Sequence, residues 1–297
     1  MKKIVVAIHG LGKQPSPSIL KAWWKYAMKD GLRRRPISLV YWADIVHQGE
    51  SGNWQKIKQL LKYRFSRHKI DSKLEGFKGF PLKRRLFRYL DANLDDIFLT
   101  KDMDVRFKSL TDKVVRHFFI DLDAYYSVDQ TTLQQNGESA KEMIQSRLYR
   151  VLKKYQNREI LLVAHSMGSI IALDVLNRFE SELSIHTLVS IGSPLGLPLV
   201  KSRIFQDQKS QDPKITMPHT PHNISVQWLN LTDPDDEVAL DQSLSDDYGE
   251  NKKGIGVRDV SIRSDYVLEG KRYPHGAFGY LRSPQMSHIL KGFFLNE

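Results

Sequence analysis

The chain has 297 residues, of which 41% are hydrophobic, and a formal net charge of +11. This length and composition suit one large globular α/β domain rather than a disordered chain. The absence of cysteine excludes disulfides, thiol nucleophiles and thiolate metal sites. No apolar run approaches the ~18 residues of a membrane span. Because the N-terminal apolar run is also too short for a signal peptide, we expect a soluble, cytoplasmic protein.

Near the N-terminus, residues 4–8 form a short apolar run that is typical of a buried strand. The run leads directly into His9-Gly10-Leu11-Gly12. A His-Gly pair after a central strand often accompanies a reactive serine, because a backbone N–H of this loop can bind a developing oxyanion. The alternative is an ordinary glycine turn after an edge strand. An amphipathic helix over about 16–31 and a strand over 37–42 are predicted next.

The regular alternation of strand and helix then stops for about ninety residues. Residues 54–65 and 82–98 have apolar positions at helical spacing, and residues 105–119 fit a third helix. A connection of this length, with this much pattern, is too long for a simple loop. We therefore expect a single domain, residues 1–297, with a helical cap inserted at about 45–130.

Most of the net charge lies inside this insert. Residues 56–88 contain twelve Lys and Arg against two acidic residues, which gives +10. The interpretation that we favour is a solvated charged face with an aromatic core beneath it. A patch for peripheral contact with anionic membrane is the alternative, because basic amphipathic helices with aromatic residues bind such surfaces. Nucleic acid is a weaker candidate partner, since no recognised binding motif accompanies the charge.

The most informative stretch is residues 158–173. An apolar run at 160–163 predicts a buried strand, Ala164-His165-Ser166-Met167-Gly168 a tight turn, and residues 170–176 a helix. A strand, a sharp turn with serine at its apex and a helix together form the nucleophile elbow of G-x-S-x-G enzymes. The residues two before and two after the serine must be small, because larger side chains would collide with the neighbouring strand and helix. Ala164 meets this demand, although it replaces the usual first glycine.

Elements on both sides of this turn continue the pattern. Residues 138–155 have the apolar stripe of a helix, and further strands are expected at 187–191, 224–231 and 257–262. The proline-rich segment 195–221 is predicted to be irregular and to overlie the site. Ser283 is expected to start a C-terminal helix.

Two loops at the ends of the later strands carry groups that can act with Ser166. Asp233, Asp235 and Asp236 follow the strand at 224–231, and His275 lies in the loop after the strand at 257–262. In a mainly parallel sheet, the loops at the carboxyl ends of the strands form the site. We therefore expect the serine, a carboxylate and the histidine to meet there.

These pieces together resemble the serine esterases and lipases of the α/β-hydrolase superfamily. The resemblance covers most of the chain except the insert. It is carried by His9-Gly10-Leu11-Gly12, Ala164-His165-Ser166-Met167-Gly168, Ile191-Gly192-Ser193-Pro194-Leu195, Asp236-Glu237-Val238-Ala239 and His275-Gly276-Ala277-Phe278. It implies an α/β-hydrolase fold, with a mainly parallel central sheet flanked by helices and a helical cap. It also implies an enzyme that cleaves a small-molecule or lipid ester without a cofactor or a metal.

The resemblance assigns a role to each residue of the site. Ser166 is the nucleophile, His275 the general base and Asp236 the acid that orients the base. The backbone N–H groups of Leu11 and Met167 form the oxyanion hole.

The choice of acid rests on a pattern within the resemblance, since lipase-like members often place it just before x-Val. This favours Asp236 over Asp233 and Asp235, with Asp241 as a remote fourth choice. The Asp236 carboxylate is then expected within ~3.2 Å of a ring nitrogen of His275.

The remaining histidines have simpler interpretations. His9 and His165 are expected to be structural, and His288 is a rival base only if His275 is misplaced. His219 and His222 have no third ligand nearby, so we do not expect them to bind a metal.

The alternative function is a non-catalytic hydrolase-fold module that binds an anionic membrane surface or a protein partner. The presence of all three triad residue types favours the enzyme.

Overall fold

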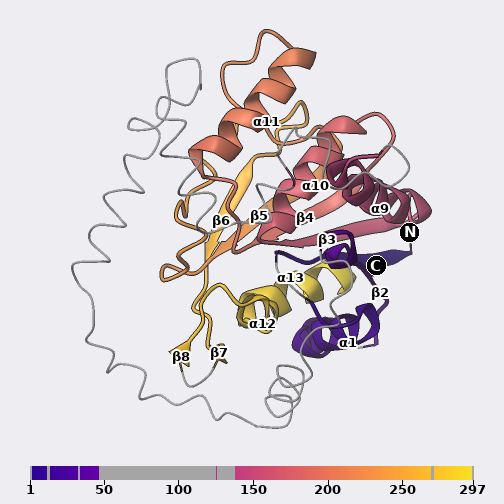
Figure 1. Ribbon diagram of the computed structural model, residues 1–297, viewed down its shortest axis with the longest axis vertical. Coiled ribbons are helices and arrows are strands. Elements are labelled where there is room, and N and C mark those ends of the chain that lie inside the picture. Colours follow the sequence, from indigo (N-terminus) through magenta and orange to yellow (C-terminus); the bar gives the residue numbers. More distant parts are fainter. Residues whose placement is uncertain are drawn as a thin grey trace, which may run out of the picture.

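The computed structural model describes residues 2–11, 14–32, 34–46, 125, 138–268 and 271–295 (Figure 1). The helical cap expected at about 45–130 falls outside these ranges apart from residues 45, 46 and 125. Its basic segment at 56–88 lies wholly outside them.

A six-stranded parallel sheet forms the centre of the described structure. Its strands are β1 (Lys3–Ile8), β2 (Ile37–Val40), β3 (Glu159–His165), β4 (Ile185–Ile191), β5 (Ile224–Thr232) and β6 (Val257–Ser261). They lie in the order β2-β1-β3-β4-β5-β6. Nearly every residue of β1, β3 and β4 is buried, which explains why these strands are continuous apolar runs in the sequence.

The strand order reverses between β1 and β3. From β1 the chain moves to β2 on one side, and the later strands then extend from β3 on the other side. In the register, Ile8 pairs with Ala164 and His165 pairs with Ile191, so β1, β3 and β4 end level with one another. Open α/β sheets bind their ligands outside the carboxyl ends of the strands at such a reversal. His9 directly follows β1 and Ser166 directly follows β3 at this point.

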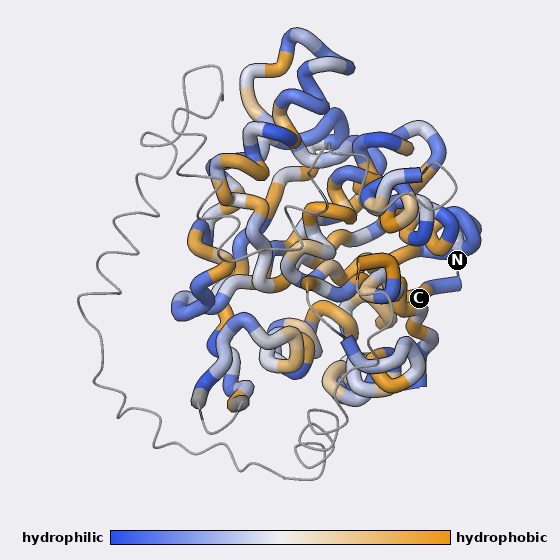
Figure 2. Tube along the Cα trace, in the orientation of Figure 1, coloured by the Kyte–Doolittle hydropathy of each residue, from blue (hydrophilic) through white to orange (hydrophobic). Residues whose placement is uncertain are grey.

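Helices cover both faces of the sheet (Figure 1). One face packs against α9 (Ala140–Lys154), α10 (Met167–Arg178) and α11 (Pro198–Gln211), and the other against α1 (Pro17–Ala27), α2 (Lys29–Leu32), α12 (Ala277–Leu281) and α13 (Pro284–Leu295). Hydrophobic residues accordingly gather along the strands and the inner sides of the helices (Figure 2). The short helix α3 (Ala43–Val46) contacts α9, and β7 (Val267–Leu268) pairs with β8 (Lys271–Arg272) in a small antiparallel ladder.

The predicted α/β fold with a parallel sheet and flanking helices is therefore confirmed. Each predicted strand is present, with ends that differ by no more than two residues. The helix predicted at 138–155 is α9, and it begins with a capping box in which Ser139 Oγ accepts from the Glu142 N–H and Glu142 accepts from the Ser139 N–H. The helix predicted at about 16–31 is divided into α1 and α2 at Met28.

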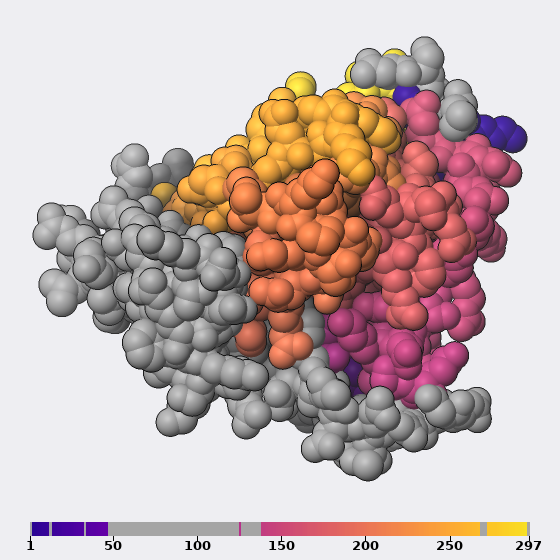
Figure 3. Space-filling model, turned by 90° about the horizontal axis from the view of Figure 1, so that it is seen from above, coloured from indigo at the N-terminus to yellow at the C-terminus, as the bar shows by residue number. Residues whose placement is uncertain are grey.

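The prediction that 195–221 is irregular was wrong, because this segment contains the fourteen-residue helix α11. Pro198 is at the first position of the helix, where its missing N–H does not matter, and the other prolines follow the helix end. The buried side of α11 includes the polar residues Lys201, Ser202 and Gln208. The sequence therefore lacks the continuous apolar stripe by which an amphipathic helix is recognised. Seen from above, the orange atoms of α11 and of the segment after it form a surface near the magenta atoms of α9 (Figure 3).

None of the helices in the described part of the chain has both the length and the apolar content needed to cross a bilayer.

Candidate active site

Ser166 sits at the junction of β3 and α10 in a strained backbone conformation. Its φ is +53° and its ψ is −129°, and it is the one non-glycine residue with positive φ in the described part of the chain. Such a conformation costs about 1–3 kcal/mol and persists only where the surroundings enforce it. Here the Ser166 N–H donates to the Ile191 carbonyl at 3.0 Å, and the Ser169 N–H donates to the Ser166 carbonyl at 2.8 Å.

Two glycines allow this turn to pack closely on the loop after β1. A Cβ added at Gly168 would lie 2.8 Å from the His9 carbonyl oxygen and 2.9 Å from that of Ile8. A Cβ at Gly10 would lie 2.7 Å from the Cβ of Ser166. The small residue expected two positions after the serine is therefore required by the packing, and the His-Gly loop lies against Ser166.

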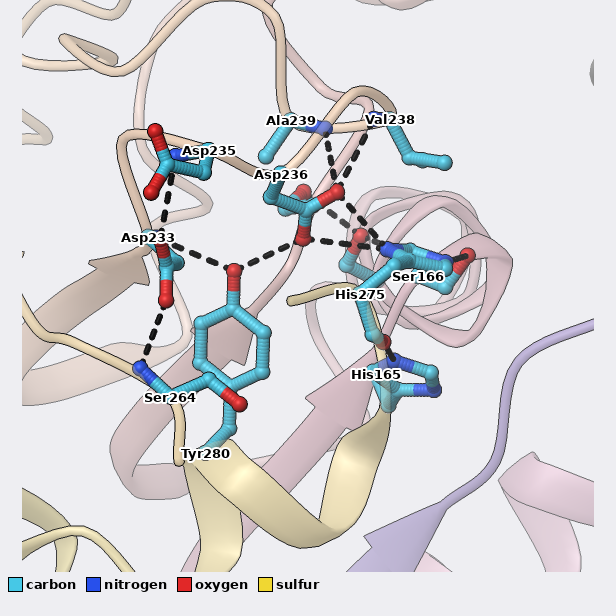
Figure 4. A network of polar contacts seen from close by, with 12 residues as sticks. His165, Ser166, Asp233, Asp235, Asp236, Val238, Ala239, Ser264, His275 and Tyr280 are labelled. Carbon is cyan, nitrogen blue, oxygen red and sulfur yellow. Dashed lines mark hydrogen bonds and ion pairs between the residues drawn. The ribbon is translucent and has the colours of Figure 1, made fainter. Parts of the chain in front are cut away.

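His275 lies between Ser166 and Asp236 (Figure 4). Its Nε2 is 3.1 Å from Ser166 Oγ, and its Nδ1 is 3.0 and 3.1 Å from the two carboxylate oxygens of Asp236. Because an ionised carboxylate only accepts hydrogen bonds, Nδ1 carries the proton and Nε2 accepts from the serine hydroxyl. The structure thus brings together residues from the ends of β3 and β5 and from the loop before α12. The Asp236 carboxylate lies within the ~3.2 Å expected for this contact.

Asp236 is held by further hydrogen bonds. Its Oδ1 accepts from the N–H groups of Val238 at 2.9 Å and Ala239 at 3.3 Å, and its Oδ2 accepts from the Tyr280 hydroxyl at 2.7 Å. Burial opposes ionisation of this carboxyl group. The hydrogen bond and charge of His275, with the hydrogen bonds from Tyr280 and Val238, nevertheless lower the pKa of Asp236 below its usual value. Asp236 is therefore a carboxylate at neutral pH.

The neighbouring aspartates have different partners. Asp233 and Asp235 both form ion pairs with Arg272, and Asp233 Oδ2 also accepts from the Ser264 N–H at 2.6 Å. Both side chains lie away from His275 (Figure 4). Asp241, the fourth choice, is 3.7 Å from the buried Lys201 ammonium. Asp236 is the described aspartate whose carboxylate contacts His275.

The two histidines expected to be structural both hold loops of the site. His9 donates from Nδ1 to the Gly10 carbonyl at 2.8 Å and accepts at Nε2 from the Trp42 N–H at 3.0 Å, which orients the loop after β1. Burial lowers the pKa of His9 to about 4, so its ring is neutral. His165 donates from Nε2 to the His275 carbonyl at 2.9 Å. Desolvation and the charge of His275 lower the pKa of His165 to about 3, so it remains a neutral donor.

His219, His222 and His288 lie outside this constellation. The rings of His219 and His222 stack with their centroids 4.5 Å apart, and His288 is exposed on α13.

One acidic group in the described structure has the spacing of metal ligands. Carboxylate oxygens of Asp241, Asp246 and Asp247 lie within 4.8 Å of one another. The Lys201 ammonium, however, is already 2.5 Å from Asp247 Oδ1. Burial and the charge of Asp241 raise the pKa of Asp247, which favours a retained proton in this cluster. The ammonium and that proton offset most of the negative charge of the group, so we assign no metal to it.

The structure adds supporting residues that the sequence analysis did not identify. Ser169 Oγ donates to the Ser166 carbonyl at 2.6 Å and lies 2.7 Å from Ser193 Oγ, which ties the loop after β4 to the turn. Gly192 and Tyr280 pack against the pair of Asp236 and His275. The Gly-Ser-Pro turn in the sequence was a partial signal for Gly192 and Ser193. A buried tyrosine five residues after the histidine has no comparable signature.

A serine hydroxyl bonded to an imidazole, which is itself bonded to a carboxylate, is an arrangement that activates a hydroxyl as a nucleophile. The first residue of the following helix adds a backbone N–H without an intrahelical partner, and here this residue is Met167. These groups suit attack on a carbonyl carbon.

Comparison with known protein families matches residues 87–277 to the model of the PGAP1-like alpha/beta domain. The match covers more than half of the chain, including Ser166, Asp236 and His275. It leaves out β1 and its loop. Among curated proteins, the comparison finds no match.

Proposed function

Because the chain belongs to the PGAP1-like alpha/beta domain family, a family of the α/β-hydrolase type, we propose that it is a serine hydrolase that cleaves carboxylic esters through an acyl-enzyme intermediate. The observation that carries the proposal is the contact of 3.1 Å between Ser166 Oγ and His275 Nε2, with Asp236 at the opposite ring nitrogen.

In the first half of the reaction, Ser166 Oγ forms a bond with the ester carbonyl carbon, and its proton passes to His275 Nε2. The carbonyl oxygen becomes an oxyanion, for which the N–H groups of Leu11 and Met167 are the proposed donors. Loss of one such donor typically lowers kcat about 10²–10³-fold. The tetrahedral intermediate collapses as the bond to the alcohol oxygen breaks and that oxygen takes the proton from Nε2.

In the second half, water gives a proton to His275 Nε2 as its oxygen attacks the acyl carbon. The Ser166 ester bond breaks, Oγ regains the proton, and the carboxylic acid is released. Asp236 keeps the Nδ1 proton in place throughout and stabilises the imidazolium that forms twice in the cycle. This chemistry requires neither a cofactor nor a metal.

Two features of the described structure support the oxyanion assignment. Met167 begins α10, so its N–H lies at the positive end of the helix dipole. Gln14 Nε2 donates to the Leu11 carbonyl at 3.0 Å and holds the loop after β1.

The proposal predicts covalent labelling of Ser166. A fluorophosphonate probe should modify the folded wild-type protein at this serine, because its hydroxyl is the one paired with His275 and Asp236. Ser166→Ala should abolish labelling and lower hydrolysis of a p-nitrophenyl ester at least about 10³-fold. Peptide mapping by mass spectrometry identifies the adduct.

Ser210→Ala is the matched control, since Ser210 is exposed near the end of α11 and its Oγ donates only to the nearby Asp207 carbonyl. It should keep full labelling and activity. Labelling that persists in Ser166→Ala would contradict the assignment of the nucleophile. A folded wild-type protein that neither reacts with the probe nor cleaves the ester would favour the non-catalytic module instead.

A further inference from the structure

The Tyr280 hydroxyl makes two hydrogen bonds, one with Asp236 and one with the Asp233 backbone. We infer that Tyr280 is a positioning residue that holds Asp236 in the orientation and charge state that His275 needs. This inference rests on the proposed function for its kinetic consequences, while the geometry behind it is independent of any substrate.

The direction of both hydrogen bonds follows from the atoms involved. The Asp233 backbone N–H can only donate, and it lies 3.0 Å from the Tyr280 hydroxyl oxygen. The phenolic proton therefore points to Asp236 Oδ2, which is 2.7 Å away and can only accept. Tyr280 is fully buried, and burial together with the charge of Asp236 raises its pKa well above the usual value. The hydroxyl thus keeps its proton at any working pH.

The position of Tyr280 in the chain links the base to the acid. His275 precedes α12 by two residues, and Tyr280 lies within α12. The same short segment therefore supplies both the ring that the acid orients and the hydroxyl that orients the acid. It meets the loop after β5 at two points, so the base and the acid cannot shift separately without breaking a buried hydrogen bond (Figure 4).

Gly192 shows how tightly these groups are packed. A Cβ at Gly192 would lie 2.9 Å from Asp236 Oδ2, 3.1 Å from Tyr280 Cε2 and 3.3 Å from His275 Nδ1. The three side chains converge on one point, and the space beside them is closed by backbone. Asp236 therefore depends on fixed protein donors rather than on solvent for its orientation.

The ionisable groups around His275 determine the expected sign of a pH effect. Besides Asp236, the rings of His165 and Tyr273 face it with centroids 5.0 and 6.4 Å away. His165 is neutral, and burial and the charge of Asp236 raise the pKa of Tyr273, so both are uncharged at neutral pH. Asp236 is thus the charged partner of the ring among these neighbours. A hydrogen bond from Tyr280 draws negative charge of that carboxylate away from His275.

Removing the hydroxyl should consequently have two effects. In Tyr280→Phe, Asp236 loses a donor and orients the imidazole less well, so kcat for a short soluble ester should fall about tenfold with little change in KM. The carboxylate also keeps more charge toward the ring, which stabilises the imidazolium. The acidic limb of the kcat/KM profile should therefore move about half a unit to higher pH.

Tyr248→Phe is the matched control, because Tyr248 is also buried and its hydroxyl donates to the Leu195 carbonyl at 2.9 Å rather than to Ser166, Asp236 or His275. It should lower thermal stability to a similar degree while leaving kcat and the pH profile unchanged. If Tyr280→Phe loses only stability and keeps both kcat and the acidic limb, the positioning role is excluded.

A second substitution tests the sign without removing the hydroxyl, and serves if Tyr280→Phe does not fold. Fluorotyrosine at position 280 makes the phenol a stronger donor, so the acidic limb should move to lower pH. No movement, or movement to higher pH, would contradict the inference.

A spectroscopic readout separates this inference from the proposed function. The His275 Nδ1 proton, shared with Asp236, should give a far-downfield proton resonance that shifts in Tyr280→Phe and not in Tyr248→Phe. A shift in a protein that fails to hydrolyse esters would support the positioning role and overturn the enzyme. An unshifted resonance in a protein that does hydrolyse esters would support the enzyme and overturn the positioning role.

Discussion

At the scale of single residues, the absence of a side chain matters as much as the groups that react. Gly192 has a φ of +51°, which glycine adopts freely and other residues adopt only with strain. It also leaves the space in which Asp236, Tyr280 and His275 converge. Each of these contacts therefore depends on the same missing methyl group.

Gly192→Ala should disturb the site more than the fold. The positive φ alone should lower the free energy of unfolding by more than about 1 kcal/mol. The added Cβ would also push Asp236 and His275 apart, and a displacement of this kind lowers kcat about 10²-fold. Ester hydrolysis and chemical denaturation measure the two effects separately.

Gly254→Ala is the control for strain without the clash. Gly254 has a φ of +71°, and the nearest atom to an added Cβ is Glu250 Oε2 at 3.9 Å. It should lose stability and keep activity. Equal activity losses in the two variants would mean that the space beside Gly192 is not what positions the pair.

At the scale of elements, the site depends on how closely α10 approaches β1. The carbonyl oxygens of Ile8 and His9 lie where a side chain at Gly168 would begin. Backbone atoms cannot rotate away as a flexible side chain can, so the helix and the strand would have to separate. Because α10 starts immediately after Ser166, such a separation would move Ser166 relative to His275.

Gly168→Ala should therefore destabilise the protein, although alanine is the better helix former by about 1 kcal/mol. Overpacking against backbone typically costs about 1–3 kcal/mol, which exceeds that gain. We also expect slower fluorophosphonate labelling of Ser166. Denaturation midpoints and labelling rates measure these outcomes.

Gly292→Ala on α13 is the matched control, for which the expected change in stability has the opposite sign. Nothing lies within 4 Å of an added Cβ there, so helix propensity alone should raise stability by up to about 1 kcal/mol. If both substitutions stabilise the protein, the contact between α10 and β1 is looser than the structure indicates.

At the scale of the whole molecule, packing on both faces of the sheet buries a histidine that ionises in the unfolded chain. His9 is 1% exposed, and this burial lowers its pKa from the ordinary value of 6.5 to about 4 in the folded protein. Between these values the unfolded chain binds the proton and the folded protein does not. Stability from His9 is therefore complete above about pH 6.5 and is lost as the pH falls toward about 4.

We expect the burial of His9 to lower the free energy of unfolding by about 2 kcal/mol as the pH falls from 7 to 5. In His9→Gln, which retains a hydrogen-bonding side chain but cannot titrate, the fall in stability should be smaller by that amount. Urea denaturation of both proteins at the two pH values gives the difference.

The comparison isolates His9 because other shifted groups are present in both proteins. Asp174 and Asp247 have raised pKa values from burial, and they act in the opposite direction as the pH falls. Asp236 has a lowered pKa, so its contribution is lost only at more acidic pH. Identical pH dependence in wild type and His9→Gln would show that His9 is not buried as a neutral ring.

The sequence by itself determined the strands, most of the helices and the serine turn. These features are local, because a buried strand needs a continuous apolar run and the turn at Ser166 needs small neighbours such as Gly168. The order of serine, acid and histidine along the chain was also readable, since the loops after parallel strands converge at one edge of the sheet.

Only the tertiary structure decided the contacts between distant side chains. Asp233, Asp235 and Asp236 occupy one short loop, in which the Asp236 N–H donates to the Asp233 carbonyl at 2.9 Å. The path of this loop directs the first two toward Arg272 and the third toward His275. The helix α11 was not predicted, because its buried polar residues pair with residues that are distant in the sequence. Tyr280 has a role only because α12 brings it to an acid 44 residues earlier in the chain. Such contacts depend on strand order and loop path, which no local pattern of residues encodes.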